Sequence, residues 1–249
     1  MNHMHVSTDT TYSDLADLVL QARPGRTLDV PAGKGDLSRE LLRRGITDLT
    51  CIDILPEAQF PLAGQVHYAQ ADINDPLPFE DSSFDCVVSR EGIEHLVTPF
   101  AFLGELCRVL KPSGTPFITT PNIMTVDARM KYLLSGYFQG FRELRDNHPG
   151  LRQLEFQGHI SPIYFWQLAY FLGNYGFTIE HVTSNQIKQE RKPLKRLFAR
   201  LIARLIRANA HRRGFPDGGT LSDEFLFGDS LIVQARRTGE RVTRHGKVF

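Results

Sequence analysis

Residues 27–36 read TLDVPAGKGD. A short apolar run ends in Asp29, a turn with Gly33 and Gly35 follows, and a helix is expected to open at Leu37. Glycine carries no Cβ, so a ligand can approach the backbone N–H groups of this turn and the N-terminus of the helix. The pattern therefore predicts a strand–turn–helix unit that binds a ligand at its turn.

This turn departs from the phosphate-binding patterns. A dinucleotide fingerprint has the form Gly-x-Gly-x-x-Gly, and the corresponding positions here are Pro31, Gly33 and Asp36. The carboxylate of Asp36 is expected where the two phosphates of a dinucleotide would bind, and it would repel them. It does not disfavour a ligand that carries an ammonium beside its carboxylate. Lys34 and Gly35 also lack the Gly-Lys-Ser/Thr order of a P-loop. The turn thus favours a nucleoside with an amino-acid tail over NAD or ATP.

Polar residues follow the next predicted strands. Asp53 closes a second apolar run, and an acid at the tip of that strand can accept both hydroxyls of a ribose. A third strand over 66–70 leads to Asp72, placed to accept from an adenine amino group, and a fourth strand, 84–89, leads into Arg90. The predicted ligand-binding residues are Asp29, Pro31, Gly33, Gly35, Asp53, Ile54, Asp72, Ile73, Ser89 and Arg90.

Strands and helices alternate along the chain, which predicts a mostly parallel sheet with helices on both faces. The expected strands are 27–31, 48–53, 66–70, 84–89, 115–120, 177–182 and 230–235, the last two pairing antiparallel. The expected helices run over 12–21, from Leu37, from Pro99 to 111–114, mainly over 122–141, and from Ser161 to Leu172. A single domain over 1–249 accounts for all of them.

The residues 28–35, Asp53, 71–72, 84–88, 94–96 and 106–114, in this order and spacing, resemble the class I S-adenosylmethionine-dependent methyltransferases. The resemblance covers roughly residues 25–185 and returns at 231–233. It implies a Rossmann-like, doubly wound α/β fold with a seven-stranded sheet whose last strand is antiparallel. Glu91, Glu94 and His95, followed by Gly158-His159, look most like ubiquinone-biosynthesis O-methyltransferases and relatives acting on sugars or lipids. Pro31 departs from the glycine usual in the family.

The resemblance implies S-adenosylmethionine as the cofactor and an in-line methyl transfer to a small-molecule, sugar or lipid-linked acceptor. An alcohol or phenol acceptor needs a base or a metal to lose its proton. The candidate catalytic residues are His95, His159 and Glu94. Ordinary structural roles stay open for both histidines: a hydrogen-bonding role for His95 and a helix cap for His159.

A divalent metal is the alternative to a base. Glu91, Glu94 and His95 have i, i+3, i+4 spacing, so on a helix they would project to one side, and the resembled quinone O-methyltransferases are thought to bind metal at these positions. Gly92 weakens a helix there, so a metal is not favoured.

The segment 186–228 is the individual feature of this chain. Its part 188–213 holds ten basic residues and one acid, Glu190, although the whole chain carries only +1. Apolar residues recur at helical spacing, so an amphipathic basic helix is expected. Its apolar face could pack on the protein's own core, on a second subunit in a homodimer, or on an anionic membrane surface. Nucleic acid is not expected, because the single aromatic residue, Phe198, lies on the apolar stripe.

Composition adds a few bounds. An apolar fraction of 41% with 23% charged residues is ordinary for a soluble protein, and Cys51, Cys86 and Cys107 are expected to be buried and reduced. No leader or membrane span is recognised, so the expected location is cytoplasmic. Peripheral contact with the inner membrane surface is an additional expectation.

The segment 122–160 is expected to cap the acceptor site. Rival functions are a non-catalytic nucleoside-binding subunit and an NAD-dependent dehydrogenase, which Asp36 disfavours.

Overall fold

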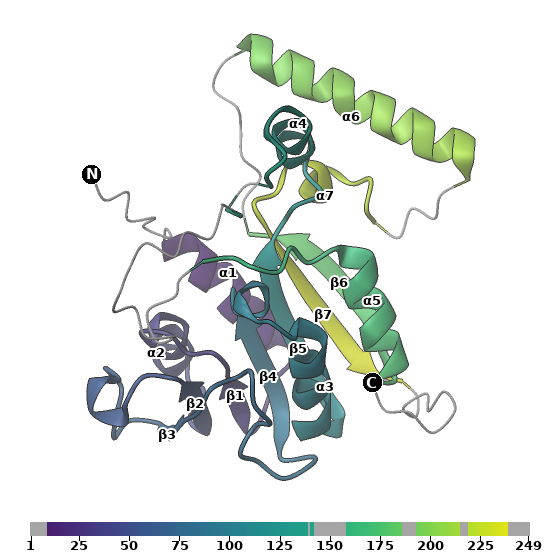
Figure 1. Ribbon diagram of the computed structural model, residues 1–249. Helices are drawn as coiled ribbons and strands as arrows, with labels where there is room; N and C mark the ends of the chain where they lie inside the picture. The colour runs from purple at the N-terminus through teal and green to yellow at the C-terminus, as the bar shows by residue number, and fades with distance from the viewer. Residues whose placement is uncertain (1–8, 139, 142–157, 186–192, 215–218, 239–249) are drawn as a thin grey trace.

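The computed structural model describes residues 9–138, 140–141, 158–185, 193–214 and 219–238. Seven strands form one sheet in the order β3-β2-β1-β4-β5-β7-β6 (Figure 1). All neighbouring pairs from β3 to β5 are parallel, and β7 is antiparallel to both β5 and β6. The predicted seven-stranded sheet with an antiparallel last strand is therefore confirmed. The strands are β1 (Thr27–Asp29), β2 (Leu49–Asp53), β3 (His67–Gln70), β4 (Phe84–Arg90), β5 (Leu110–Pro121), β6 (Phe177–Ser184) and β7 (Ser230–Arg237).

Helices cover both faces of the sheet. Alternate residues of a strand point to opposite faces, so Cys86 and Val88 of β4 share one core with the first two helices while Val87 joins a second core with the third and fifth. Cys51, Cys86 and Cys107 are buried free thiols, as expected. The helices of these two cores are α1 (Asp9–Gln21), α2 (Asp36–Arg43), α3 (Pro99–Val109) and α5 (Phe165–Asn174).

Three further helices lie beyond the carboxyl ends of the parallel strands (Figure 1). They are α4 (Val126–Ser135), α6 (Pro193–Arg213) and α7 (Asp223–Phe227), and they share a small core of Val126, Ala203 and Leu226. Within the described residues, no helix is both long enough and apolar enough to cross a bilayer.

Several predicted bounds were wrong. The helix expected from Ser161 begins only at Phe165; the stretch before it is held to the loop after β4, where the N–H groups of Ile160 and Ser161 donate to the backbone oxygen of Glu94 at 3.0 and 2.9 Å. The strand expected over 115–120 extends over Leu110–Pro121.

The segment 122–141 is helical only in α4, which Thr125 caps by accepting from Ala128 N at 3.0 Å and which Gly136 ends with a φ of 73°. Most of the remainder of the expected cap 122–160 lies outside the described residues. Of the segment 186–228, residues 186–192 and 215–218 also lie outside them.

Candidate active site

The glycine turn between β1 and α2 is held against β2. Ala32 N donates to Ile52 O at 2.7 Å, and Gly33 N donates to the Asp53 carboxylate at 2.7 Å. Gly33 and Gly35 have φ of 56° and 73°, a region that favours glycine. The turn predicted from the sequence thus forms, and its Gly33 N–H is bound to the acid at the tip of β2.

Pro31 fits into this turn because Gly92, the residue that its ring contacts, has no side chain. The Val30–Pro31 peptide is cis, and the proline ring packs directly on Gly92. Gly92 lies in the loop after β4, next to Glu91. The turn and this loop therefore share one contact surface.

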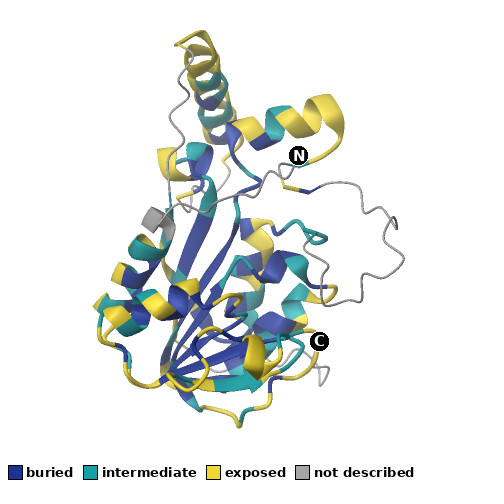
Figure 2. Cartoon of the chain, turned by 90° about the vertical axis from the view of Figure 1, so that its left-hand side faces the viewer, coloured by how far each residue is buried: buried dark blue, intermediate teal, exposed yellow. Residues whose placement is uncertain are grey.

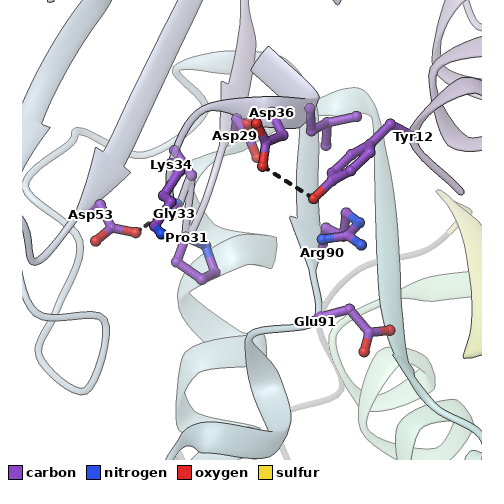
Figure 3. Close-up of a pocket in the computed structure, with 11 residues that line it drawn as sticks. Tyr12, Asp29, Pro31, Gly33, Lys34, Asp36, Asp53, Arg90 and Glu91 are labelled. Carbon is purple, nitrogen blue, oxygen red and sulfur yellow. Dashed lines mark hydrogen bonds between the residues drawn. The ribbon is translucent and has the colours of Figure 1, made fainter. Parts of the chain in front are cut away.

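A pocket of about 180 Å³ opens beside the turn, at the carboxyl ends of β1, β2 and β4 (Figure 3). It brings together five of the predicted ligand-binding residues. The lining residues are Tyr12, Asp29, Pro31, Ala32, Gly33, Lys34, Asp36, Leu37, Asp53, Arg90 and Glu91.

The other five predicted residues do not line this pocket. Gly35 precedes α2 as its N-cap, and Ser89 is buried within β4. Asp72 accepts from both the backbone and side-chain nitrogens of Asn74 at 2.9 Å. Ile73 lines a second cavity of about 250 Å³ beside α3, and Ile54 follows β2 outside both cavities.

Tyr12 is the main lining residue that the sequence did not indicate. It comes from α1, and its ring lies under the Arg90 guanidinium, 4.1 Å from the guanidinium carbon to the ring centre (Figure 3). Its hydroxyl donates to Asp36 at 3.4 Å. No sequence signal connects Tyr12 to the turn, because only the tertiary packing of α1 on α2 brings it there.

A second polar cluster follows β4. His95 ends a single 3₁₀ turn, η2 (Ile93–His95), and its ring centre lies 4.7 Å from that of His159. Its Nδ1 is 3.1 Å from the backbone oxygen of Gly158. Glu94 is fully buried and accepts from Thr120 Oγ1 at 3.2 Å, while its other oxygen has no hydrogen-bond partner among the described residues.

The comparisons with known proteins agree with this geometry. A family model described as a methyltransferase domain matches residues 28–118. The chain therefore contains a methyltransferase domain of the S-adenosylmethionine-dependent kind.

Among its relatives, a ubiquinone biosynthesis O-methyltransferase of Xanthomonas campestris is 36% identical over 109 residues, or 41% of this chain and 45% of that protein. One of Xanthomonas euvesicatoria is 28% identical over 171 residues, covering 66% and 67%. The chain thus aligns over less than half the length of the first of these relatives. A solved structure of Burkholderia thailandensis 1,6-didemethyltoxoflavin-N1-methyltransferase, with S-adenosylhomocysteine bound, shares the fold at a TM-score of 0.55 and 17% identity, over 94% of this chain and 82% of that one.

The pocket carries charges of both signs. Asp29, Asp36 and Asp53 line it together with Lys34 and Arg90. Burial raises the pKa of Asp29 to about 7, although Ser38 Oγ donates to it at 2.5 Å. Burial also raises the pKa of Asp53, against the hydrogen bonds from backbone N–H groups. Such a site suits a zwitterion, whose ammonium and carboxylate can each meet an opposite charge.

The histidine cluster is electrostatically different from the pocket. Burial lowers the pKa of His95, and burial with the neighbouring His95 lowers that of His159 to about 4. Burial, and then Glu91, raise the pKa of Glu94 well above its usual value. At neutral pH both imidazoles are therefore uncharged, and the Glu94 carboxyl binds a proton more readily than an exposed glutamate does.

The metal ligands suggested by the sequence do not all come together. The helix on which Glu91, Glu94 and His95 would share a face is absent from this described loop: Glu91 has a φ of 47°, and only η2 follows. The residues that do converge are Glu94, His95 and His159, whose ligand atoms all lie within 4.8 Å of one another. These three residues, without Glu91, are therefore the candidate ligands of an ion in this loop.

Proposed function

We propose that this protein is an S-adenosylmethionine-dependent methyltransferase that methylates an oxygen of a small-molecule acceptor, in the class of phenols, sugars and lipid-linked intermediates. One observation carries the proposal. The glycine turn holds Asp53 at the edge of the pocket through Gly33 N–H, while Asp29 and Asp36 occupy the side where a pyrophosphate would bind. This combination accepts a nucleoside with a zwitterionic tail and disfavours a dinucleotide.

The donor-binding roles follow from where each group lies. Asp53, at the tip of β2, is the proposed acceptor for the ribose hydroxyls. Asp29 is the proposed partner of the ammonium, and Arg90, held over the Tyr12 ring, that of the carboxylate. Asp72 is proposed to bind the adenine amino group, which requires its side chain to exchange the contact with Asn74 for one with the base.

Bound S-adenosylmethionine supplies a methyl group already activated by its positive sulfur. In one displacement the acceptor oxygen forms a bond to the methyl carbon, the carbon–sulfur bond breaks, and S-adenosylhomocysteine leaves. The protein has to align the two reactants and take the acceptor's proton.

His95 is the proposed base. Gly158 O can only accept a hydrogen bond, so Nδ1 of His95 carries the hydrogen and Nε2 keeps its lone pair. A lowered pKa keeps this imidazole neutral at pH 7. Glu94 is a positioning residue: its backbone oxygen accepts from Ile160 and Ser161, which fixes the segment that carries His159 beside His95.

A lipid-linked acceptor is favoured over a freely diffusing one. The basic helix α6 lies beyond the carboxyl ends of the strands, the same end of the molecule as the pocket (Figure 1). The rival function, a non-catalytic nucleoside-binding subunit, is disfavoured because a degenerate pocket should have lost some of Asp29, Gly33, Asp53 and their contacts.

Two measurements test the proposal. Titration calorimetry should show binding of S-adenosylhomocysteine and no binding of NADH, with affinity for the former reduced at least tenfold in Asp53→Asn. Methyl-labelled S-adenosylmethionine, incubated with the protein and a total cell extract, should label one product, recovered in the lipid fraction. Binding without any transfer would support the regulatory subunit instead, and preferential NADH binding would overturn the proposal.

A further inference from the structure

The amphipathic helix α6 packs on the protein through its small residues. Ala203 and Ala210 are buried, and Ala199, Ile202 and Ile206 are partly buried against α4 and α7. Arg207, on the same side, donates to Leu221 O at 2.8 Å and to Asp223 at 2.6 Å. These contacts fix the rotation of α6 about its axis.

The large apolar residues of α6 point the other way. At about 100° per residue, they form a stripe opposite Ala203, and Figure 2 shows the outer side of the helix as exposed. Burying all seven large apolar side chains, one of the alternatives open from the sequence, is therefore not what the structure does. The five exposed ones are Leu194 (77%), Leu197 (57%), Phe198 (52%), Leu201 (46%) and Leu205 (65%).

The end of α4 adds to this apolar surface. Leu133 and Leu134 are 74% and 80% exposed, and Tyr132 and Tyr137 about half exposed. Since α4 packs against α6 through Val126 and Ala203, both exposed segments lie at one end of the molecule (Figures 1 and 2). We call this set the apolar end surface: the five α6 residues, Tyr132, Leu133 and Leu134 of α4, and Tyr137 just after α4.

Basic residues border the stripe on α6. Arg196, Arg200 and Arg204 recur at four-residue spacing between the packed side and the stripe, with Arg204 next to the stripe. Lys195 and Arg213 lie on the other side of the helix, and α6 contains no acid. Among the carboxylates that the structure describes, none lies within ion-pairing distance of Arg196, Arg200 or Arg204. The apolar end surface is thus framed by positive charge without a described counter-charge.

We propose that the apolar end surface is a docking site for an anionic membrane, with α6 lying in the plane of the interface. An interfacial helix needs an apolar face for the acyl boundary and a cationic border for the lipid head groups, and α6 supplies both. Each basic residue near an anionic leaflet raises affinity about fivefold at low salt.

The charges disfavour the other occupants. A second copy joined about a two-fold axis would set the arginine row of one α6 beside that of the other, with no acid on either helix to separate them. Nucleic acid would leave five large apolar side chains against phosphates. An anionic bilayer satisfies the stripe and its border together.

Docking in this way would bring the carboxyl edge of the sheet close to the bilayer. The inference extends the lipid-linked acceptor of the proposed function, and it names the surface that reaches such an acceptor. Vesicle binding needs neither donor nor acceptor, so it is measured independently of methyl transfer.

The test is co-sedimentation of the full chain with vesicles of phosphatidylcholine alone or with 30% phosphatidylglycerol added, at roughly 0.05 M and 0.5 M salt. We expect binding to the anionic vesicles at low salt only. The triple variant Arg196→Gln/Arg200→Gln/Arg204→Gln should lose roughly 100-fold in partitioning. Leu197→Ser/Leu201→Ser/Leu205→Ser should also lose binding, and because all three leucines are exposed the fold should not change.

A matched control removes the same number of positive charges from the opposite end of the molecule. Arg23, Arg43 and Arg236 are exposed near the amino edge of the sheet, and their triple glutamine variant should bind as the wild type does. Negligible binding by the wild type, or equal binding by all variants, would overturn the inference. So would a stable dimer in light scattering that the leucine variant dissociates, because the surface would then belong to a second copy.

Discussion

Pro31 and Gly92 are complementary: a Cβ on Gly92 would stand 2.3 Å from Cδ of Pro31 and 2.7 Å from its Cγ. The contact joins the two halves of the site. Pro31 belongs to the turn that lines the pocket, and Gly92 lies between Glu91 of the pocket and Glu94 of the histidine cluster. The proline that departs from the family pattern is thus matched by the absence of a side chain on the facing loop.

Gly92→Ala should therefore disturb both halves. The new methyl group must displace either the proline ring or the loop, which typically costs about 1–3 kcal/mol of unfolding free energy. We expect a comparable loss in urea denaturation and weaker binding of S-adenosylhomocysteine in calorimetry. The double variant Pro31→Gly/Gly92→Ala should recover much of the donor binding.

Gly173→Ala is the matched control. Gly173 is exposed near the end of α5, and a Cβ there meets nothing within 4 Å. It should leave binding unchanged and stability equal or slightly higher. If Gly92→Ala behaved like Gly173→Ala, the contact with Pro31 would have no structural role.

The proton on Asp29 gives the second prediction. Its pKa of about 7 in the free protein means that it is mostly protonated at pH 6. An ammonium placed beside it favours the ionised form and lowers that pKa. Binding of S-adenosylhomocysteine at pH 6 should then release roughly one proton, seen as a slope of binding enthalpy against buffer ionisation enthalpy, and none at pH 8.5.

Asp29→Asn has no proton to release and should show no slope at pH 6. Its neutral amide can still accept from Ser38, so the fold should be retained. An equal slope in the variant would place the released proton on another group, and a flat wild type would place the ammonium elsewhere.

The sequence identified the parts of the site that depend on local chain geometry. The turn with Gly33, the acid at Asp53 and the order of strands could all be predicted. The strand order follows from the alternation of strands and helices, and the turn and the acid occupy positions that require a glycine or a carboxylate. Tyr12 and the Pro31–Gly92 contact could not, since segments far apart in the chain meet only after folding.

Long-range hydrogen bonds explain another miss. Ser161-Pro162 has a typical helix-start sequence, but Ser161 N–H donates to Glu94 O and its hydroxyl donates to Leu96 O at 2.7 Å, so the residue is tied to the loop after β4 and the helix begins only at Phe165. The helix α6 could be predicted from the sequence, but the direction of its apolar face could not. The small residues Ala203 and Ala210, and not the leucines, are the ones buried against the rest of the protein.

The third prediction concerns the base. With the pKa of His95 below its usual 6.5, the transfer rate on the labelled acceptor should stay level from pH 8 to below pH 6.5 and fall only in more acidic solution. His95→Gln should lower kcat by about 10²–10⁴-fold with little change in affinity for S-adenosylhomocysteine, because His95 does not line the donor pocket.

His159→Gln separates catalysis from packing. His159 contacts His95 and Phe141 through its ring, so this variant should alter the acid limb of the pH profile through His95 and reduce kcat less. Loss of activity in His159→Gln equal to that of His95→Gln, with an unchanged pH profile, would assign the base to His159.

The last prediction concerns metal. The ligand atoms of Glu94, His95 and His159 lie within 4.8 Å of one another, but Nδ1 of His95 is engaged by Gly158. Burial and the neighbouring Glu91 raise the pKa of Glu94, so an ion would also have to compete with a proton for this carboxylate. We therefore expect protein treated with EDTA to retain its transfer rate and its melting temperature, and added Mn²⁺ or Zn²⁺ to produce no saturable heat in calorimetry at pH 7. The opposite outcome would be that chelation abolishes transfer, that Mn²⁺ restores it, and that Glu94→Gln loses both this restoration and the heat of Mn²⁺ binding. The three side chains would then bind an ion in solution, and His95 would act as a metal ligand and not as the base.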